Sequence, residues 1–186
     1  MNWKNYQEST KKSQPNYLTI YANHNFVFQT VIDFGCGSGS DSVYLVKHGK
    51  KVLAIDQLLE PDYFYSRLPK KYYSRLTFLE SNFEDLDLPQ VDCVIALFSL
   101  SFCNPDQFEK VWKKISNSIL AHGIFIGNLF GDRDYRRNPT DINTFTKEEV
   151  LNLLKDYDIK KWKEQEYIRD SDSTHWHYFD FVVTKK

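Results

Sequence analysis

The sequence has few glycines and few cysteines, and it has neither a long apolar segment nor an excess of charge of one sign. Its 186 residues include 7 glycines and 3 cysteines. No window approaches the roughly 20 apolar residues that span a bilayer, and no apolar segment follows the first charges, so we expect no membrane association. The odd cysteine count, without a CxxC pair, suits a reducing compartment, and we expect a cytoplasmic protein.

The near absence of net charge argues against binding of free nucleic acid. Formal net charge is -1, with 24 basic and 25 acidic residues, so the overall field would not attract free nucleic acid. The length allows one ordinary core, and we predict a single domain over residues 1–186. Within it we expect a helical or lid segment over 1–28 and a core over 29–186, in a monomer or homodimer.

What the sequence does contain is a series of short apolar runs. These are VIDF at 31–34, VLAID at 52–56, LTFLE at 76–80, VDCVIALF at 91–98 and IFIGNLF at 124–130. The runs are mostly continuous, which is typical of strands buried on both faces of a parallel sheet. IKKWKEQEYIRD and HWHYFDFVVTKK, separated by the polar turn DSDST, predict a hairpin at the sheet edge. The pattern indicates an α/β doubly wound domain.

Helix signals lie between several of these runs. Asn104 followed by Pro105 predicts a helix start, with the helix reaching about Leu120. Thr146 and Glu149 form a capping box that predicts a second helix. Prolines at 61 and 69 make any helix between the second and third runs short or broken.

Three of the seven glycines alternate in the segment VIDFGCGSGSDSVYL, residues 31–45, directly after the first predicted strand. Glycines allow a tight turn with unusual dihedral angles and let a ligand approach bare backbone. Ligands of doubly wound sheets bind at the carboxyl ends of the strands, which is where these glycines lie. We therefore expect the segment to hold a ligand, with a helix beginning at about Ser40 or Asp41.

Carboxylates around the glycines restrict the ligand. Asp33 precedes them and Asp41 follows them, giving DxGxGxG rather than the GxGxxG of dinucleotide sites. Acids here would repel a pyrophosphate and suit a cation such as S-adenosylmethionine, which carries an ammonium and a sulfonium. A dinucleotide-dependent oxidoreductase remains an alternative.

From about residue 17 onward, the sequence resembles the class I S-adenosylmethionine-dependent methyltransferases. VIDFGCGSG matches their first motif, and Asp56 stands where the family keeps an acid for the ribose hydroxyls. ALFSLSFCNPDQF, NLFGDRD and HWHYFDFVVTKK resemble a group of small bacterial enzymes near the tellurite-resistance (TehB-like) methyltransferases. The resemblance implies a Rossmann-like, mostly parallel seven-stranded sheet with an antiparallel final strand.

The cofactor implied is S-adenosyl-L-methionine, with S-adenosyl-L-homocysteine as the product. Family positions after the third strand point to adenine contacts, although the asparagine there could equally cap a turn. The expected cofactor-binding residues are Asp33, Gly35, Cys36, Gly37, Gly39, Asp56, Gln57, Asn82, Phe83 and Phe98.

The acceptor pocket should be rich in aromatic side chains, since rings near a sulfonium add cation–π stabilisation. Strand-end positions and the segment before the first strand supply the candidates, which are Ser99, Phe102, Arg133, Trp176 and Tyr21. Ordinary packing is the alternative for the aromatics. An ion pair within its own turn is the alternative for the arginine.

Two histidines flank a tryptophan at the start of the last run. Period-two alternation sends His175 and His177 to one face of the strand and Trp176 to the other. If the acceptor must lose a proton, a histidine is the natural base near neutral pH, so both are candidate catalytic residues. Structural histidines are the main alternative. We expect no metal, because no third ligand is evident.

The favoured function is methyl transfer to a small-molecule acceptor by in-line displacement, because the chain leaves little length for a macromolecule-binding module. Two alternatives stay open. One is a non-catalytic S-adenosylmethionine-binding scaffold or sensor, and the other is methylation of a macromolecule presented by a partner.

Overall fold

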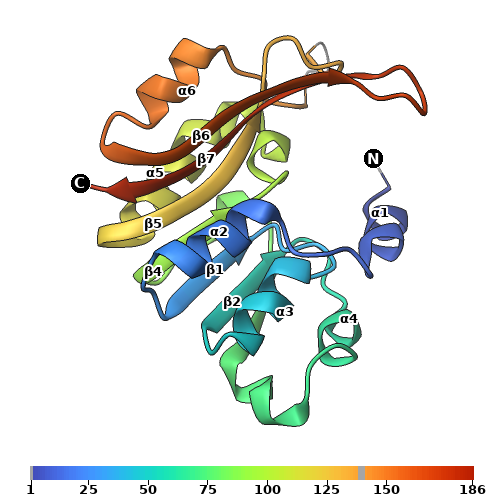
Figure 1. The fold of residues 1–186 in the computed structure, drawn as a ribbon, viewed down its shortest axis with the longest axis vertical. Coiled ribbons are helices and arrows are strands. Elements are labelled where there is room, and N and C mark those ends of the chain that lie inside the picture. Colours follow the sequence, from blue (N-terminus) through green and yellow to red (C-terminus); the bar gives the residue numbers. More distant parts are fainter. Residues whose placement is uncertain (1, 138–140) are drawn as a thin grey trace.

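Seven strands form one sheet in the computed structural model, which describes residues 2–137 and 141–186 (Figure 1). Their order across the sheet is β3-β2-β1-β4-β5-β7-β6. The strands are β1 (Thr30–Phe34), β2 (Lys51–Asp56), β3 (Leu76–Glu80), β4 (Val91–Ala96), β5 (Ile119–Phe130), β6 (Tyr157–Ile168) and β7 (His175–Lys185).

The strand directions agree with the predicted fold class. β1 pairs in parallel with β2 and β4, and the parallel arrangement continues to β3 on one side and β5 on the other. β7 lies between β5 and β6 and runs antiparallel to both. The predicted hairpin therefore closes the sheet, with β6 at its edge.

Helices cover both faces of the sheet. The helices are α1 (Trp3–Thr10), α2 (Tyr17–Asn25), α3 (Ser40–Lys47), α4 (Pro61–Tyr65), α5 (Phe108–Ser118) and α6 (Lys147–Leu153). Side chains of α2, α3 and α4 belong to one buried apolar cluster, and those of α5 and α6 belong to the cluster on the opposite face. Among the described residues, no helix is long and apolar enough to cross a membrane.

Both predicted caps form, but only one of them begins an α-helix. Thr146 and Glu149 make the full capping box, with Thr146 N donating to Glu149 Oε2 at 2.7 Å and Glu149 N donating to Thr146 Oγ1 at 3.2 Å. Asn104 accepts from Asp106 N at 2.9 Å, but it caps a single 3-10 turn that precedes α5. α5 ends at Ser118, two residues before the predicted limit, because β5 begins at once.

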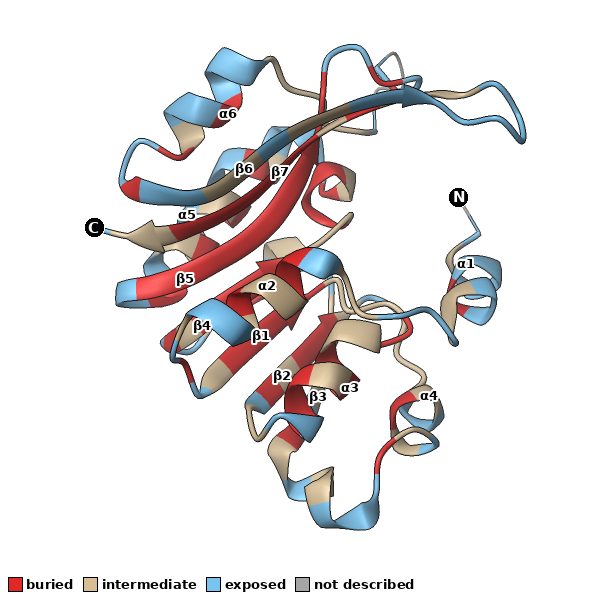
Figure 2. Ribbon diagram, viewed as in Figure 1, coloured by how far each residue is buried: buried red, intermediate tan, exposed pale blue. Residues whose placement is uncertain are grey.

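Two strands differ from the sequence prediction. β5 begins five residues before the apolar run at 124, with an exposed first part that Figure 2 shows in pale blue. His122 in this part has φ of 63°, and the β4–β5 register shifts between Val91 and Cys93. β3 is largely exposed rather than buried on both faces, because it forms the other edge of the sheet.

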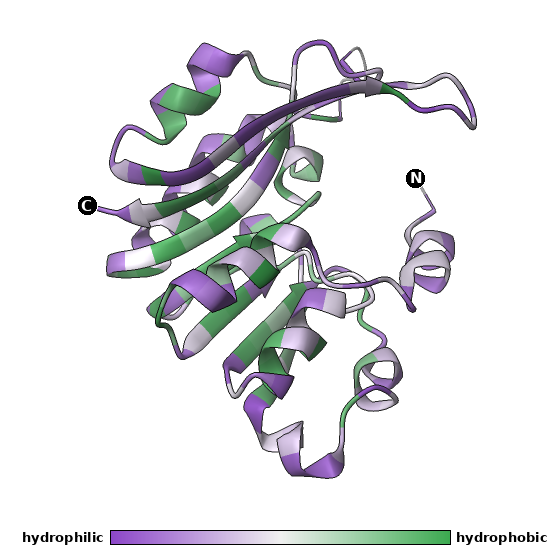
Figure 3. Cartoon of the chain, in the orientation of Figure 1, coloured by the Kyte–Doolittle hydropathy of each residue, from purple (hydrophilic) through white to green (hydrophobic). Residues whose placement is uncertain are grey.

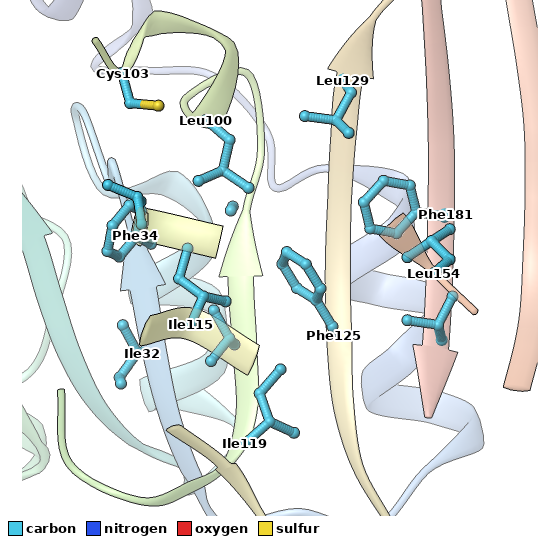
Figure 4. Packing of buried hydrophobic residues seen from close by; sticks show 14 of the residues in the cluster. Ile32, Phe34, Leu100, Cys103, Ile115, Ile119, Phe125, Leu129, Leu154 and Phe181 are labelled. Atoms are coloured by element: carbon cyan, nitrogen blue, oxygen red, sulfur yellow. The ribbon is translucent and has the colours of Figure 1, made fainter. Parts of the chain in front are cut away.

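The central strands carry the hydrophobic core. Figure 3 shows apolar residues along β5 and β7 and a mostly polar β6, in line with its edge position. In Figure 4, Phe125 of β5 and Ile115 of α5 lie among Ile32, Phe34 and Phe181, all of them buried. This packing fixes the strand ends from which the site is built, and truncating a buried phenylalanine such as Phe125 to alanine costs about 3–5 kcal/mol.

Candidate active site

A cavity of about 430 Å³ lies at the carboxyl ends of the parallel strands. The turn after β1, the ends of β2 and β4, the segment after β3 and helix α1 form its walls, and we call it the cofactor cleft. The lining residues that matter below are Trp3, Tyr6, Gln7, Thr10, Asp33, Gly35, Cys36, Gly37, Asp41, Asp56, Gln57, Asn82, Phe83, Glu84, Phe98, Ser99, Phe102 and Cys103.

The three glycines after β1 have different roles, although all three have positive φ. A Cβ at Gly35 would lie 2.3 Å from Ser99 Cβ, and one at Gly39 would lie 2.1 Å from the Phe64 ring. A Cβ at Gly37 would meet nothing within 4 Å. Gly37 therefore presents bare backbone to open space, whereas Gly39 serves packing and does not line the cleft.

Asp56 closes one side of the turn. Its Oδ2 accepts from Gly37 N at 2.8 Å, and its Oδ1 accepts from Leu58 N at 3.1 Å. Burial raises the pKa of Asp56, and these backbone donors act against that rise. Each carboxylate oxygen has two lone pairs, so both can accept a further hydrogen bond from a ligand diol.

Asp33 lies deeper, at the end of β1. It is 4% exposed, and Ser42 Oγ donates to its Oδ2 at 2.6 Å. Burial, followed by the neighbouring charge of Asp41, raises the pKa of Asp33. Asp41 in turn accepts from Asn16 N at 2.8 Å. Three aspartates thus face one another across a small cleft.

The charge of the cleft is of one sign. Its acids are Asp33, Asp41, Asp56 and Glu84, and no lysine, arginine or histidine lines it among the described residues. Such a cavity repels a pyrophosphate and attracts a cation. The donor set therefore fits the predicted ligand, which carries an ammonium and a sulfonium, and it does not fit a dinucleotide.

The residues after β3 also reach the cleft. Asn82 and Phe83 both line it, and the Phe83 ring stacks on Phe34 with 4.1 Å between ring centroids. Their contact with an adenine ring stays a prediction, as do the roles expected for Cys36 and Gln57, which line the cleft as well.

A buried hydrogen-bond network fixes the residues after β4. Phe98 has φ of 51°, a left-handed conformation that phenylalanine rarely adopts, and its N donates to Asn128 Oδ1 at 2.6 Å. Asn128 lies 3.4 Å from Asp180 Oδ1, and Tyr17 Oη donates to Asp180 Oδ2 at 2.6 Å. Groups from α2, β5 and β7 therefore hold Phe98 at the cleft. Ser99, beside it, donates to the backbone of β1.

A second cavity of about 180 Å³ adjoins the cleft, and we call it the aromatic chamber. Its walls are Trp3, Tyr6, Phe98, Phe102, Phe130, Arg136 and Trp176, of which the first four also line the cleft. Phe102 and Trp176 were predicted for the acceptor pocket and Phe98 for the cofactor site, and the structure brings the three together. Arg136 and Phe130 were not anticipated.

The two candidate catalytic histidines line neither cavity. His177 is fully buried, with its Nδ1 accepting from Arg133 N at 3.1 Å and its Nε2 3.3 Å from Glu164 Oε1. His175 Nε2 lies 3.0 Å from Glu166 Oε1. The alternation along β7 places Trp176 in the chamber and leaves both imidazoles outside it, so the geometry does not support a general-base role.

Arg133 and Tyr21 are likewise absent from both cavities. Arg133 Nη2 donates to Glu164 at 2.7 Å and to Glu166 at 2.8 Å, which lowers the pKa of Glu166 to about 2. These partners lie on β6, outside the turn, and the ion pair within the turn that the sequence left open is the longer contact of Arg133 Nη1 with Asp132 Oδ1 at 3.7 Å. Tyr21 packs under Lys161, whose Nζ lies 4.3 Å from the ring centroid.

The same cluster contains metal-compatible ligands that the sequence did not reveal. Atoms of Glu164, Glu166 and His177 lie within 4.8 Å of one another. Because the guanidinium of Arg133 already donates to both carboxylates and Lys147 also pairs with Glu164, both carboxylates have cationic partners, and we assign no metal to the cluster.

We expected a helical or lid segment over 1–28 from the sequence, but the side chains of helix α1 that form a wall of the site were not among the candidates. Trp3, Tyr6, Gln7 and Thr10 recur at spacings of three and four residues, which places them on one helix face. Gln7 is 2% exposed and donates to Leu58 O at 2.8 Å. The spacing was a usable signal, but the family resemblance begins only at about residue 17.

Comparisons with known proteins identify the class of protein. A methyltransferase domain family matches residues 31–123. TehB from Haemophilus influenzae is similar in structure, with a TM-score of 0.81, 16% identity and coverage of 97% of this chain and 66% of that one. No curated protein matches the chain.

Two further similar structures contain S-adenosylhomocysteine. One is the 1,6-didemethyltoxoflavin-N1-methyltransferase of Burkholderia thailandensis, also bound to 1,6-didemethyltoxoflavin, with a TM-score of 0.70, 21% identity and coverage of 91% and 76% of the two chains. The other is the N-methyltransferase NodS of Bradyrhizobium japonicum WM9, with a TM-score of 0.69, 11% identity and coverage of 100% and 99%.

The family match spans half of the chain, so the protein belongs to the methyltransferase domain family. The predicted enzyme class, an S-adenosylmethionine-dependent methyltransferase, is confirmed, and the predicted Rossmann-like sheet is confirmed with it. At these low identities the solved structures share the fold, and their acceptors remain properties of those proteins.

Proposed function

We propose that the protein transfers a methyl group from S-adenosylmethionine to a small-molecule acceptor by in-line displacement. The observation that carries the proposal is the pairing of two cavities: an acidic cleft without basic lining residues opens beside a small aromatic chamber. A cationic cofactor suits the cleft, and a compact acceptor suits the chamber.

The chain's own residues would hold the cofactor by hydrogen bonding and charge. Asp56 accepts from the ribose hydroxyls through the lone pairs that Gly37 and Leu58 leave available. The exposed backbone at Gly37 lets the ligand approach closely. Asp33 and Asp41 supply the negative field that stabilises the ammonium of the amino-acid end.

The cofactor, when bound, supplies an activated methyl group, so the protein's task is orientation and exclusion of water. Phe98 and Phe102 line both cavities, and rings in this position stabilise positive charge at the reacting carbon. Cys103 is no candidate nucleophile, because burial raises the pKa of its thiol to about 12.

The size of the chamber supports a small acceptor over a polymer. Its 180 Å³ accommodates roughly a single ring with a substituent, and four large aromatic side chains shared with the cleft enclose the junction.

The testing experiment is calorimetric titration with S-adenosylhomocysteine and, separately, with NADH. We expect micromolar binding of the former and none of the latter. Label transfer from radioactive S-adenosylmethionine into a cell extract, resolved by mass, then tests the acceptor. Label found entirely in polymer would refute the small-molecule part, and binding without any transfer would favour the scaffold alternative.

A further inference from the structure

One arginine in the aromatic chamber is buried to an unusual degree. Arg136 is 6% exposed, and its guanidinium carbon lies 4.3 Å from the Phe130 ring centroid, 4.0 Å from Tyr135 and 4.1 Å from Trp176. Arginine is rarely buried unless its charge is paired. Three aromatic rings therefore pack around a buried guanidinium at the wall of the chamber.

The partner of this arginine holds it in one orientation. Asp134, fully buried, accepts from Arg136 Nη1 at 2.8 Å and from Arg136 N at 3.0 Å through Oδ1, while its Oδ2 accepts from His177 N at 3.0 Å. The pair leaves at least one buried donor of the guanidinium unused, because Arg136 Nε has no hydrogen-bond partner among residues 2–137 and 141–186. A buried donor without an acceptor is unfavourable, and a ligand oxygen would satisfy it.

We propose that the aromatic chamber binds the methyl acceptor and that the acceptor is a small, flat organic anion, typified by a single-ring aromatic carboxylate whose oxygen accepts from Arg136. This assignment rests on the proposed function, which gives the adjoining cleft to the cofactor. It goes further by naming the acceptor's chemical class and the residue that selects it.

The distribution of charge supports an anion over a neutral molecule. Among the described residues, Arg136 is the only basic side chain lining either cavity; it lines the chamber alone, whereas the four acids line the cleft alone. The cleft draws in a cationic donor, and the chamber offers its positive group to the acceptor. Donor and acceptor of opposite charge also attract each other across the junction.

The remaining walls suit a flat ring. Phe98, Phe102 and Phe130 supply apolar faces, and Trp176 packs at 6.4 to 6.5 Å from Phe98 and Phe130 in edge-on arrangements. Tyr6 adds a hydroxyl that stays protonated, since burial raises its pKa. A planar anion would thus meet aromatic surface along its body and a donor at its charged end.

The test compares two probes of nearly the same shape, benzoate and benzyl alcohol. Binding is followed by the fluorescence of Trp3 and Trp176 and by calorimetry, with and without saturating S-adenosylhomocysteine. We expect benzoate to bind the wild-type protein at least tenfold more tightly than benzyl alcohol. Arg136→Gln should remove that preference, whereas Arg137→Gln, an exposed arginine one residue further on, should preserve it.

Equal binding of the two probes, or no binding of either, would overturn the proposal. Arg136→Gln leaves the Asp134 carboxylate buried without its partner, so the double variant Asp134→Asn/Arg136→Gln is measured beside it. The comparison of the two probes on the wild-type protein does not depend on the folding of any variant. Titration of the same samples with S-adenosylhomocysteine distinguishes failure of the acceptor class from failure of the proposed function. Cofactor binding without benzoate preference refutes the acceptor class alone, and absence of cofactor binding refutes the proposed function.

Discussion

Replacing Asp56 by alanine tests the cofactor assignment most directly. The carboxylate already accepts from Gly37 N and Leu58 N, and it retains one lone pair on each oxygen for the ribose hydroxyls. Hydrogen bonds to a charged group contribute about 1.5–3 kcal/mol each. Loss of two such bonds, partly replaced by water, should weaken binding by about 3 kcal/mol, which is on the order of a hundredfold in Kd.

Calorimetric titration with S-adenosylhomocysteine measures the effect, and thermal unfolding establishes that the variant folds. Glu80→Gln is the matched control, because Glu80 is an exposed acid that accepts from Leu59 N near the same strand ends without lining the cleft. Its affinity should stay within about twofold of wild type, as expected for an exposed group. Wild-type affinity in a folded Asp56→Ala variant would refute the ribose contact.

Three other predictions concern the turn, its buried acid and the histidines. Gly37→Ala should fold with about 1 kcal/mol of left-handed strain and should lose cofactor affinity, which titration measures. Gly39→Ala, whose methyl would meet the Phe64 ring, should mainly lower Tm, which thermal unfolding measures. Because burial raises the pKa of Asp33, the stability of the ligand-free protein should fall as pH rises from about 4 through the folded-state pKa. Asp33→Asn should flatten this fall of Tm with pH. An unchanged dependence of Tm on pH would contradict the prediction. His175→Gln should leave the pH profile of methyl transfer unaltered, and a displaced acidic limb would restore its role as a base.

The sheet could be predicted because burial leaves a strong signal in sequence. Strands covered on both faces, such as β1 and β4, consist of continuous apolar residues. The exposed start of β5 gave no such signal, because the three residues after Ile119 are exposed and only Ile119 pairs with β4 before the register shift. The α6 cap was predictable because all its hydrogen bonds lie within four residues.

The cofactor cleft was largely predictable, and the chamber was only partly so. Asp33 and Asp56 occupy the carboxyl ends of neighbouring parallel strands, which the fold brings together independently of loop conformation. Arg136 lies in a polar segment beside Arg137, and nothing local distinguishes the buried arginine from the exposed one. Its burial depends on the Phe130 ring at the end of β5 and on the Trp176 ring of β7, and the latter is remote in sequence.

The histidines show the limit of a periodicity argument. Alternation along β7 correctly separated Trp176 from both imidazoles, but it could not say which face meets the chamber. The face that carries the histidines is the one on which His177 contacts Arg133 and Glu164, and those contacts are not visible in the alternation of β7. Gly39 is similar, since only the position of α4 reveals that it serves packing.

Helix α1 also matters for how the protein can be handled in the laboratory. Trp3 and Tyr6 line both cavities, so residues fused immediately ahead of the helix would emerge beside the binding region. Figure 1 shows the carboxyl end of the chain on the opposite side of the molecule. An affinity tag, fluorophore or surface tether is therefore best attached after Lys186, where it leaves the entrance to both cavities free.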